Sequence, residues 1–182
     1  MKIAKGKWRI VFVFPWFGIV IKIPVIRFYE GIKPFLKPKE WKRLKGRTVL
    51  LKLMIKYRRP FLFGGLVNNW NEFWFYLKTR NPFLQPTYFS FFGLFNIQRY
   101  GEPCNLPIID LWKCLYKITN GEVFEDSHTF GDPNNFCFYN GKLRIVDYGS
   151  RRTHPVIRRY GKRIIELFNS VFLERRKEIR TL

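Results

Sequence analysis

Apolar residues gather in two short runs near the start of the chain. Residues Lys7–Phe14 (KWRIVFVF) and Phe17–Ile26 (FGIVIKIPVI) are rich in β-branched and aromatic side chains and are separated by Pro15-Trp16. This pattern predicts two antiparallel strands joined by a short turn. Lys22 is the only charge inside the second run, and a lysine there lies either on the wet face of the strand or buried in the fold.

The rest of the chain shows alternating helix and strand patterns. Aromatic residues recur at helical spacing after Gly64-Gly65, and Asn140-Gly141 is a strong hairpin signal. The predicted elements are, in order, a helix over Val67–Thr79, strands over Pro86–Phe92 and Leu94–Tyr100, a helix over Asn105–Ile118, a hairpin of Phe136–Tyr139 and Lys142–Val146, and a basic helix from about His154 to Glu178. Paired strands that alternate with helices predict an α+β fold.

Composition supports a packed protein. The chain has 182 residues, of which 47% are hydrophobic and 19% aromatic, which excludes wholesale disorder. Three widely spaced cysteines (Cys104, Cys114 and Cys137) and two histidines (His128 and His154) form no pattern of zinc ligands. The cysteines are expected to be reduced, and no apolar run approaches the ~18 residues that would span a bilayer. We therefore expect a cytoplasmic protein without a transmembrane segment.

Charge divides the chain into three blocks. The formal net charge is +21, and residues 1–60 and 151–182 are strongly basic whereas residues 61–150 are nearly neutral. Between Lys33 and Arg59 there are 11 basic residues and one acid, with a basic helix expected over Lys39–Tyr57. Such a balance predicts an anionic partner. The basic arm Lys33–Arg59 and the basic tail Arg151–Arg180 are therefore candidate contacts for nucleic acid or another polyanion.

The nearly neutral middle block carries the candidate chemistry. A dense polar cluster runs from Glu125 to Asn135 (EDSHTFGDPNN), and Asp147-Tyr148-Gly149 ends the hairpin that follows it. The amide of Asn135 and the carboxylate of Asp147 are oxygen donors of the kind that Mg²⁺ prefers. Glu72 is the sole acid between Trp41 and Gly101, so it is the carboxylate available to hold Lys22 if that lysine is buried.

In this order the pieces resemble the protein-kinase-like family. There a strand lysine pairs with a glutamate on the next helix, while a loop asparagine and the aspartate of an Asp-Phe-Gly turn bind the metal. Val20-Ile21-Lys22 is similar to the strand-lysine motif, and Glu72, Asn135 and Asp147-Tyr148-Gly149 match the other motifs. The resemblance implies ATP and Mg²⁺ as cofactors, with Lys22, Asn135 and Asp147 holding the nucleotide and the last two holding the metal.

The resemblance also implies a two-lobed protein-kinase-like fold. A small antiparallel-sheet N-lobe would cover residues 1–103 and a reduced helical C-lobe residues 104–182. Three departures modify this expectation. No Gly-x-Gly-x-x-Gly stands between the first strands, a basic insertion at about residues 27–66 separates Lys22 from Glu72, and only 33 residues follow Gly149.

Two aspartates are candidates for the base that accepts a substrate proton. The residue five positions before Asn135 is Phe130, which cannot accept a proton. Small kinase-like phosphotransferases often carry D-x-H-P-x-N, and Asp126-Ser127-His128 followed by Pro133-Asn134-Asn135 fits if Thr129–Asp132 is an insertion. Asp126 is then the base, and it is the preferred choice. Asp132 is the alternative, and in a third interpretation there is no base and the protein is a pseudokinase.

The expected function is an ATP- and Mg²⁺-dependent kinase-like phosphotransferase acting on an unidentified hydroxyl substrate. Lys22, Glu72 and Asp126 would be its catalytic residues. The alternative is a non-catalytic, pseudokinase-type binding protein that grips nucleic acid or another polyanion through the basic arm and tail. A third possibility joins the two, with the basic regions docking the enzyme on an anionic surface or partner.

Overall fold

A computed structural model describes residues 1–6, 8–25 and 59–180. Within these residues the fold is α+β, as the sequence predicts, with a five-stranded antiparallel sheet, a small three-stranded sheet and four α-helices. The helix predicted over Lys39–Tyr57 lies outside the described residues, as does the basic arm Lys33–Arg59 except for its last residue.

The larger sheet contains both strand pairs predicted before residue 101. Its strand order is β1-β2-β3-β5-β4, with all neighbours antiparallel. The strands are β1 (Lys2–Lys5), β2 (Arg9–Phe14), β3 (Ile19–Pro24), β4 (Thr87–Ser90) and β5 (Asn96–Arg99). A 3-10 turn over Pro15–Phe17 joins β2 to β3. The edge strand β1 is not among the predicted strands, because all four of its residues are exposed and no buried face marks them.

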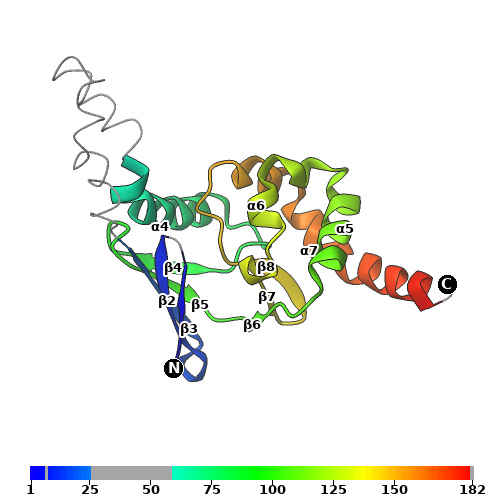
Figure 1. Cartoon of the computed structure of the whole chain (residues 1–182), viewed down its shortest axis with the longest axis horizontal. Helices are drawn as coiled ribbons and strands as arrows, with labels where there is room; N and C mark the ends of the chain where they lie inside the picture. Colours follow the sequence, from blue (N-terminus) through cyan, green and yellow to red (C-terminus); the bar gives the residue numbers. More distant parts are fainter. Residues whose placement is uncertain (7, 26–58, 181–182) are drawn as a thin grey trace, which may run out of the picture.

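Helix α4 (Arg59–Thr79) packs on one face of this sheet, against β3 and β4 (Figure 1). It is longer than the predicted Val67–Thr79, because the helix continues through Gly64-Gly65 instead of starting after them. A Cβ atom on Gly65 would lie 2.4 Å from the Trp8 carbonyl oxygen and 2.7 Å from the Pro24 Cβ. Gly65 therefore lets the helix approach the ends of β2 and β3.

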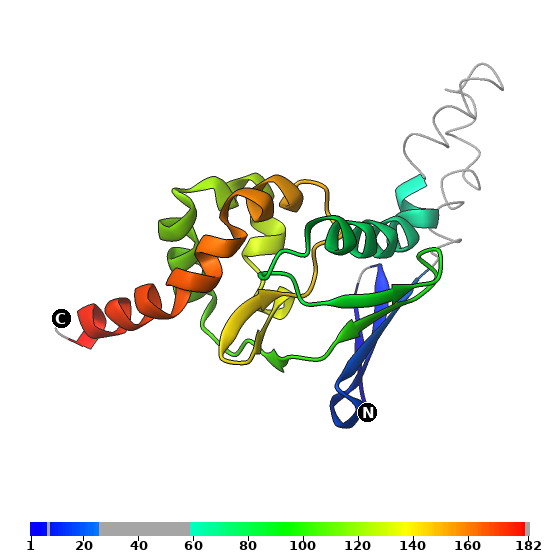
Figure 2. The same ribbon diagram turned by 180° about the vertical axis from the view of Figure 1, so that it is seen from behind.

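The rest of the described chain forms a second packed group (Figures 1 and 2). Its elements are β6 (Glu102–Pro103), α5 (Ile108–Thr119), a 3-10 turn (Glu122–Asp126), α6 (Ser127–Phe130), a 3-10 turn (Pro133–Asn135), β7 (Phe136–Tyr139), β8 (Lys142–Ile145) and α7 (Thr153–Arg180). Helices α5 and α7 pack together, and their buried side chains form the main hydrophobic core with the β7–β8 hairpin. No helix in the described ranges is long and apolar enough to cross a membrane.

The predicted hairpin is confirmed, and it is anchored to the chain that leaves α4. Asn140 and Gly141 have φ values of 50° and 67° at the turn between β7 and β8. Leu84 and Ile145 form a parallel bridge. The amide of Ile145 donates to the Phe83 carbonyl at 2.8 Å, and the amide of Gln85 donates to the Ile145 carbonyl at 2.9 Å. These bonds bring the end of β8 next to α4 and the larger sheet.

The close approach at Gly65 generates a stability prediction. We expect Gly65→Ala to lower the free energy of unfolding by about 1–3 kcal/mol, because the added methyl overpacks the contact with Trp8 and Pro24. Gly64→Ala is the matched control, since its Cβ would lie 3.3 Å from the Trp8 ring and alanine is the better helix former. Urea unfolding checks this, and equal stabilities of the two variants would contradict it.

Candidate functional site

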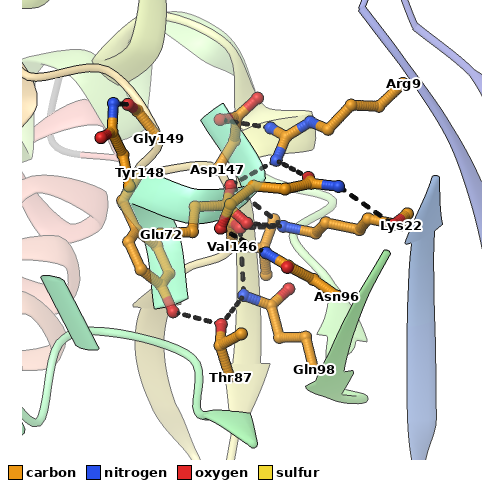
Figure 3. A network of polar contacts seen from close by, with 12 residues as sticks. Arg9, Lys22, Glu72, Thr87, Asn96, Gln98, Val146, Asp147, Tyr148 and Gly149 are labelled. Atoms are coloured by element: carbon orange, nitrogen blue, oxygen red, sulfur yellow. Dashed lines mark hydrogen bonds and ion pairs between the residues drawn. The ribbon is translucent and has the colours of Figure 1, made fainter. Parts of the chain in front are cut away.

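Lys22 and Glu72 form a buried ion pair between strand β3 and helix α4 (Figure 3). The Lys22 Nζ lies 3.0 Å and 3.3 Å from the two carboxylate oxygens, and the Glu72 side chain is 0% exposed. Burial lowers the pKa of Lys22, and the neighbouring Arg9 adds to this, while Glu72 opposes the shift. Lys22 is therefore buried and does not lie on the wet face of the strand. It pairs with Glu72, fifty positions later in the chain, as expected.

The same ammonium group also binds the segment that follows the hairpin. Lys22 Nζ donates to the carbonyl oxygen of Val146 at 2.5 Å. The Gln98 side chain on β5 donates to the same carbonyl at 3.2 Å. The residue that precedes Asp147 is therefore attached to both β3 and β5.

Arg9, at the start of β2, joins Glu72 to Asp147 and is not among the sequence-predicted site residues. Its Nη1 lies 2.5 Å from Glu72 Oε1 and its Nη2 lies 2.6 Å from Asp147 Oδ1, and its side chain is 8% exposed. Burial by itself would lower the pKa of Arg9, but Asp147 and Glu72 outweigh that effect and raise it. The guanidinium group therefore stays charged in the interior.

A sequence signal for Arg9 exists but depends on the register of β2 and β3. Arg9 pairs with Pro24 and Val11 pairs with Lys22, so Arg9 and Lys22 lie on the same face of the sheet. The apolar pattern of β2 shows that a charge interrupts the strand, as it does in β3. It does not show that the two charges lie on the same face of the sheet, because this depends on which residues of β2 and β3 pair with each other.

Asp147 lies at the edge of this cluster and is partly open to solvent. Its side chain is 43% exposed. Burial of the group by itself would raise the pKa of Asp147, but Arg9 and Lys22 beside it hold the pKa below its ordinary value. Asp147 is therefore an ionised carboxylate with one oxygen bound to Arg9.

The two residues after Asp147 fix the turn in place. The Tyr148 side chain is buried, and its hydroxyl donates to the Gln85 carbonyl at 2.8 Å and lies 2.6 Å from Thr87 Oγ1. Gly149 lies against α4, where the Asn71 amide donates to its carbonyl at 3.1 Å. A Cβ on Gly149 would lie 2.7 Å from the Asn68 carbonyl oxygen. Glycine is needed here because the helix backbone is close.

Asn135 is adjacent to this turn through the backbone. The amide of Val146 donates to the Asn135 carbonyl at 2.8 Å. The side-chain nitrogen of Asn135 donates to the Thr129 carbonyl at 3.0 Å, so the Oδ1 atom is the end of the amide left to accept. The structure thus brings Asn135 beside the residue that precedes Asp147.

Asp126 has a different environment from these residues. It is 8% exposed, and its carboxylate caps α6 by accepting from the Thr129 amide at 3.4 Å and from the Thr129 hydroxyl at 3.0 Å. It also accepts from the Thr153 hydroxyl at 2.5 Å. These bonds tie α6 to the start of α7.

Asp132 lies in the turn directly before Asn135 and is partly exposed. Its Oδ1 accepts from the Asn134 backbone amide and side-chain amide, each at 2.9 Å. His128 is exposed on α6. His154 is stacked on Phe75 with ring centroids 3.7 Å apart, and its Nε2 lies 2.9 Å from the Tyr148 carbonyl oxygen.

The four charged side chains of this cluster balance one another. Two cations, Arg9 and Lys22, neutralise two carboxylates, Glu72 and Asp147. Among the described residues no group of three or more His, Cys, Asp or Glu could hold a metal ion. Mg²⁺ needs only one or two protein oxygens because it keeps several waters. The amide oxygen of Asn135 and the carboxylate of Asp147 fit that requirement in donor type.

Glu72 should matter far more to stability than an exposed glutamate in an ion pair. We expect Glu72→Gln to cost about 3–5 kcal/mol of unfolding free energy, because it leaves two buried cations without their shared carboxylate. The control is Glu122→Gln, whose partner Arg159 is 65% exposed, and there we expect little change. Urea unfolding of both variants measures this. A similar loss of unfolding free energy in the two variants would show that Glu72 stabilises the fold no more than an exposed glutamate does.

Comparison with known proteins gives no family to which the chain can be assigned. No family model, no curated protein and no solved structure matches this chain. A function must therefore be argued from the site itself, in which a buried lysine–glutamate pair, a buried arginine and a half-exposed aspartate converge from four segments of the chain.

Proposed function

We propose that the protein is a minimal kinase-like phosphotransferase that binds ATP at the Lys22–Asp147 site. The observation that carries this proposal is the chain of contacts from Glu72 through Lys22 Nζ to the Val146 carbonyl, next to Asp147. It supports the proposal because a buried lysine held by one glutamate, beside a half-exposed aspartate, is an arrangement suited to binding a triphosphate. In this proposal the larger sheet with α4 is the N-lobe and residues 104–182 form a reduced C-lobe.

Each residue of the site then has a defined part. Lys22 binds a phosphate oxygen, and Glu72 holds the ammonium group in position. Asn135 and Asp147 would hold Mg²⁺, which when bound neutralises phosphate charge. Such catalysis consists mainly of positioning and charge neutralisation, and the network of hydrogen bonds around Val146 and Tyr148 supplies the required rigidity.

The transfer itself is a displacement at the γ-phosphorus. The oxygen of a substrate hydroxyl forms a bond to phosphorus, the bond from phosphorus to the β,γ-bridging oxygen breaks, and ADP leaves with that electron pair. The hydroxyl proton passes to an aspartate. Geometry favours Asp132 over Asp126 for this role, because Asp126 is buried and accepts from Thr129 and Thr153, whereas Asp132 is partly exposed three positions before Asn135.

A thermal-shift titration with ATP tests the binding site. We expect ATP with Mg²⁺ to raise the melting temperature of the wild type, because a ligand of the native state stabilises it by about 2.7 kcal/mol at a hundredfold excess over its dissociation constant. The shift should vanish in Lys22→Ala and persist in the exposed control Lys142→Ala. No shift of the wild type at millimolar ATP would refute the proposal.

ATP turnover distinguishes the two candidate bases. We expect Asp132→Asn to keep the ATP-induced thermal shift but to lose ATP hydrolysis, in which water takes the place of the substrate hydroxyl. Asp126→Asn should instead lower the melting temperature, since it weakens the cap of α6 and the bond to Thr153. ADP release measures turnover. Wild-type turnover in Asp132→Asn would remove Asp132 from the catalytic role.

A second candidate function is polyanion binding, because basic side chains are exposed along and just before α7. These are Arg151, Arg152, Arg158, Arg159, Lys162 and Arg163. Arg159 is already paired with Glu122, and the others have no acidic partner among the ion pairs of the described residues. A cluster of this kind favours phosphate backbones without reading their sequence.

Salt dependence tests this second function. We expect a single-stranded oligonucleotide to bind less tightly as salt rises, and the triple variant Arg152→Gln, Lys162→Gln, Arg163→Gln to reduce the slope of log K against log salt by about 0.7 for each phosphate contact that is lost. The matched control replaces Lys2, Lys113 and Lys142, which are exposed on other elements. Fluorescence anisotropy gives the slopes, and equal slopes in both variants would exclude α7 as the binding surface.

A further inference from the structure

The side of Asp147 that faces the cluster already has a cation. Arg9 Nη2 lies 2.6 Å from Asp147 Oδ1, and Arg9 Nη1 lies 2.5 Å from Glu72. Both carboxylates are thus compensated by fixed side chains of the protein. A divalent cation on Asp147 would come within a few ångströms of this guanidinium group, and like charges at such separations repel strongly when they are partly buried.

The described backbone beside Arg9 is already engaged at Gly6. The Gly6 amide donates to the Arg9 carbonyl at 2.8 Å. The first strands also lack the glycine-rich sequence that offers a row of free amides. Arg9 and Lys22 lie on one face of β2 and β3, so the cations for an anionic ligand come from these two side chains.

We propose that Arg9 takes the place of a divalent cation at Asp147, so that the site binds a triphosphate without needing a metal to hold it. Arginine suits this role because its planar group carries five donors. Arg9 Nη1 binds Glu72 and Asn69 and Nη2 binds Asp147, so Nε–H and the second Nη2–H are the donors for a phosphate. Arg9 is thus a phosphate-binding and positioning residue, and a metal serves turnover rather than binding. The triphosphate half of this inference rests on the proposed function, whereas the competition between Arg9 and a metal does not.

Calorimetric titration of the 182-residue chain tests whether the site binds a triphosphate without a metal. We expect the wild type to bind ATP with nearly the same affinity in EDTA as in Mg²⁺. Arg9→Gln should bind ATP in EDTA about tenfold or more weakly, with a smaller loss in Mg²⁺, because a metal can then occupy the vacated side of Asp147. Arg9→Lys should restore only part of the binding in EDTA, since it keeps the charge but lacks the planar fork of donors. A merely structural role of Arg9 would instead weaken the binding of ATP equally in EDTA and in Mg²⁺.

A titration with Mn²⁺ alone tests the competition. Free Mn²⁺ is followed by electron paramagnetic resonance, with folding of each variant checked by its melting curve. We expect Arg9→Gln to bind Mn²⁺ at least about tenfold more tightly than the wild type, because a repelling cation has gone. The double variant Arg9→Gln, Asp147→Asn should lose that gain, which assigns the site to Asp147.

The outcomes separate this inference from the proposed function. Wild-type binding of ATP in Mg²⁺ but not in EDTA overturns the inference and leaves the proposed function standing. Absence of ATP binding in both media overturns the proposed function, and the Mn²⁺ titration still decides whether Arg9 competes with a metal. Unchanged Mn²⁺ binding in folded Arg9→Gln shows that Arg9 does not compete with a metal, and weaker binding shows that Arg9 supports a metal site; either result overturns the inference.

Discussion

The structure around the site depends on one fully buried carboxylate. Glu72 lies between Arg9 of β2 and Lys22 of β3, and removal of either cation would leave a buried charge that is only partly compensated. This requirement fixes α4 against the sheet at a defined depth and rotation. Because Lys22 also binds the Val146 carbonyl and Arg9 binds Asp147, the same carboxylate determines where the turn after β8 lies.

Neutral polar side chains reinforce these ion pairs, and most of their bonds cross between elements. The Asn69 side chain on α4 donates to the carbonyls of Lys22 and Gly93 at 3.2 Å and 3.0 Å, and the Asn96 side chain on β5 donates to the Asn69 carbonyl at 2.8 Å. Buried networks of this kind are costly when they are incomplete and rigid when they are satisfied. The Asn96 Oδ1 atom has no hydrogen-bond partner among the described residues, but the bonds that are made hold α4 and β5 together around the charged groups.

The two aspartates of the central loop show how structure separates residues that look alike in sequence. Both precede Asn135 in one polar stretch, and the resemblance to the D-x-H-P-x-N motif favours Asp126. In the fold the Asp126 carboxylate accepts from Thr129 and Thr153, and Thr153 lies on α7, which is not part of that motif. Within the described ranges the Asp132 side chain bonds to Asn134, a neighbour that is visible in the sequence.

The sequence by itself determined the strand pairs and the Asn140-Gly141 hairpin, because local periodicity and turn chemistry leave few alternatives. The scarcity of acids between residues 41 and 101 marked Glu72 as the carboxylate available to Lys22, but it left open whether Lys22 is buried. Tertiary structure decided the rest. Trp74 is one of the aromatic residues that recur at helical spacing after Gly64-Gly65, yet its side chain is 41% exposed and the buried face of α4 carries Asn69 and Glu72. The role of Arg9 and the need for glycine at position 65 likewise arise from strand register and helix approach. Strand register and helix approach bring together residues that are distant along the chain, and no local sequence pattern shows which of these residues will be close in space.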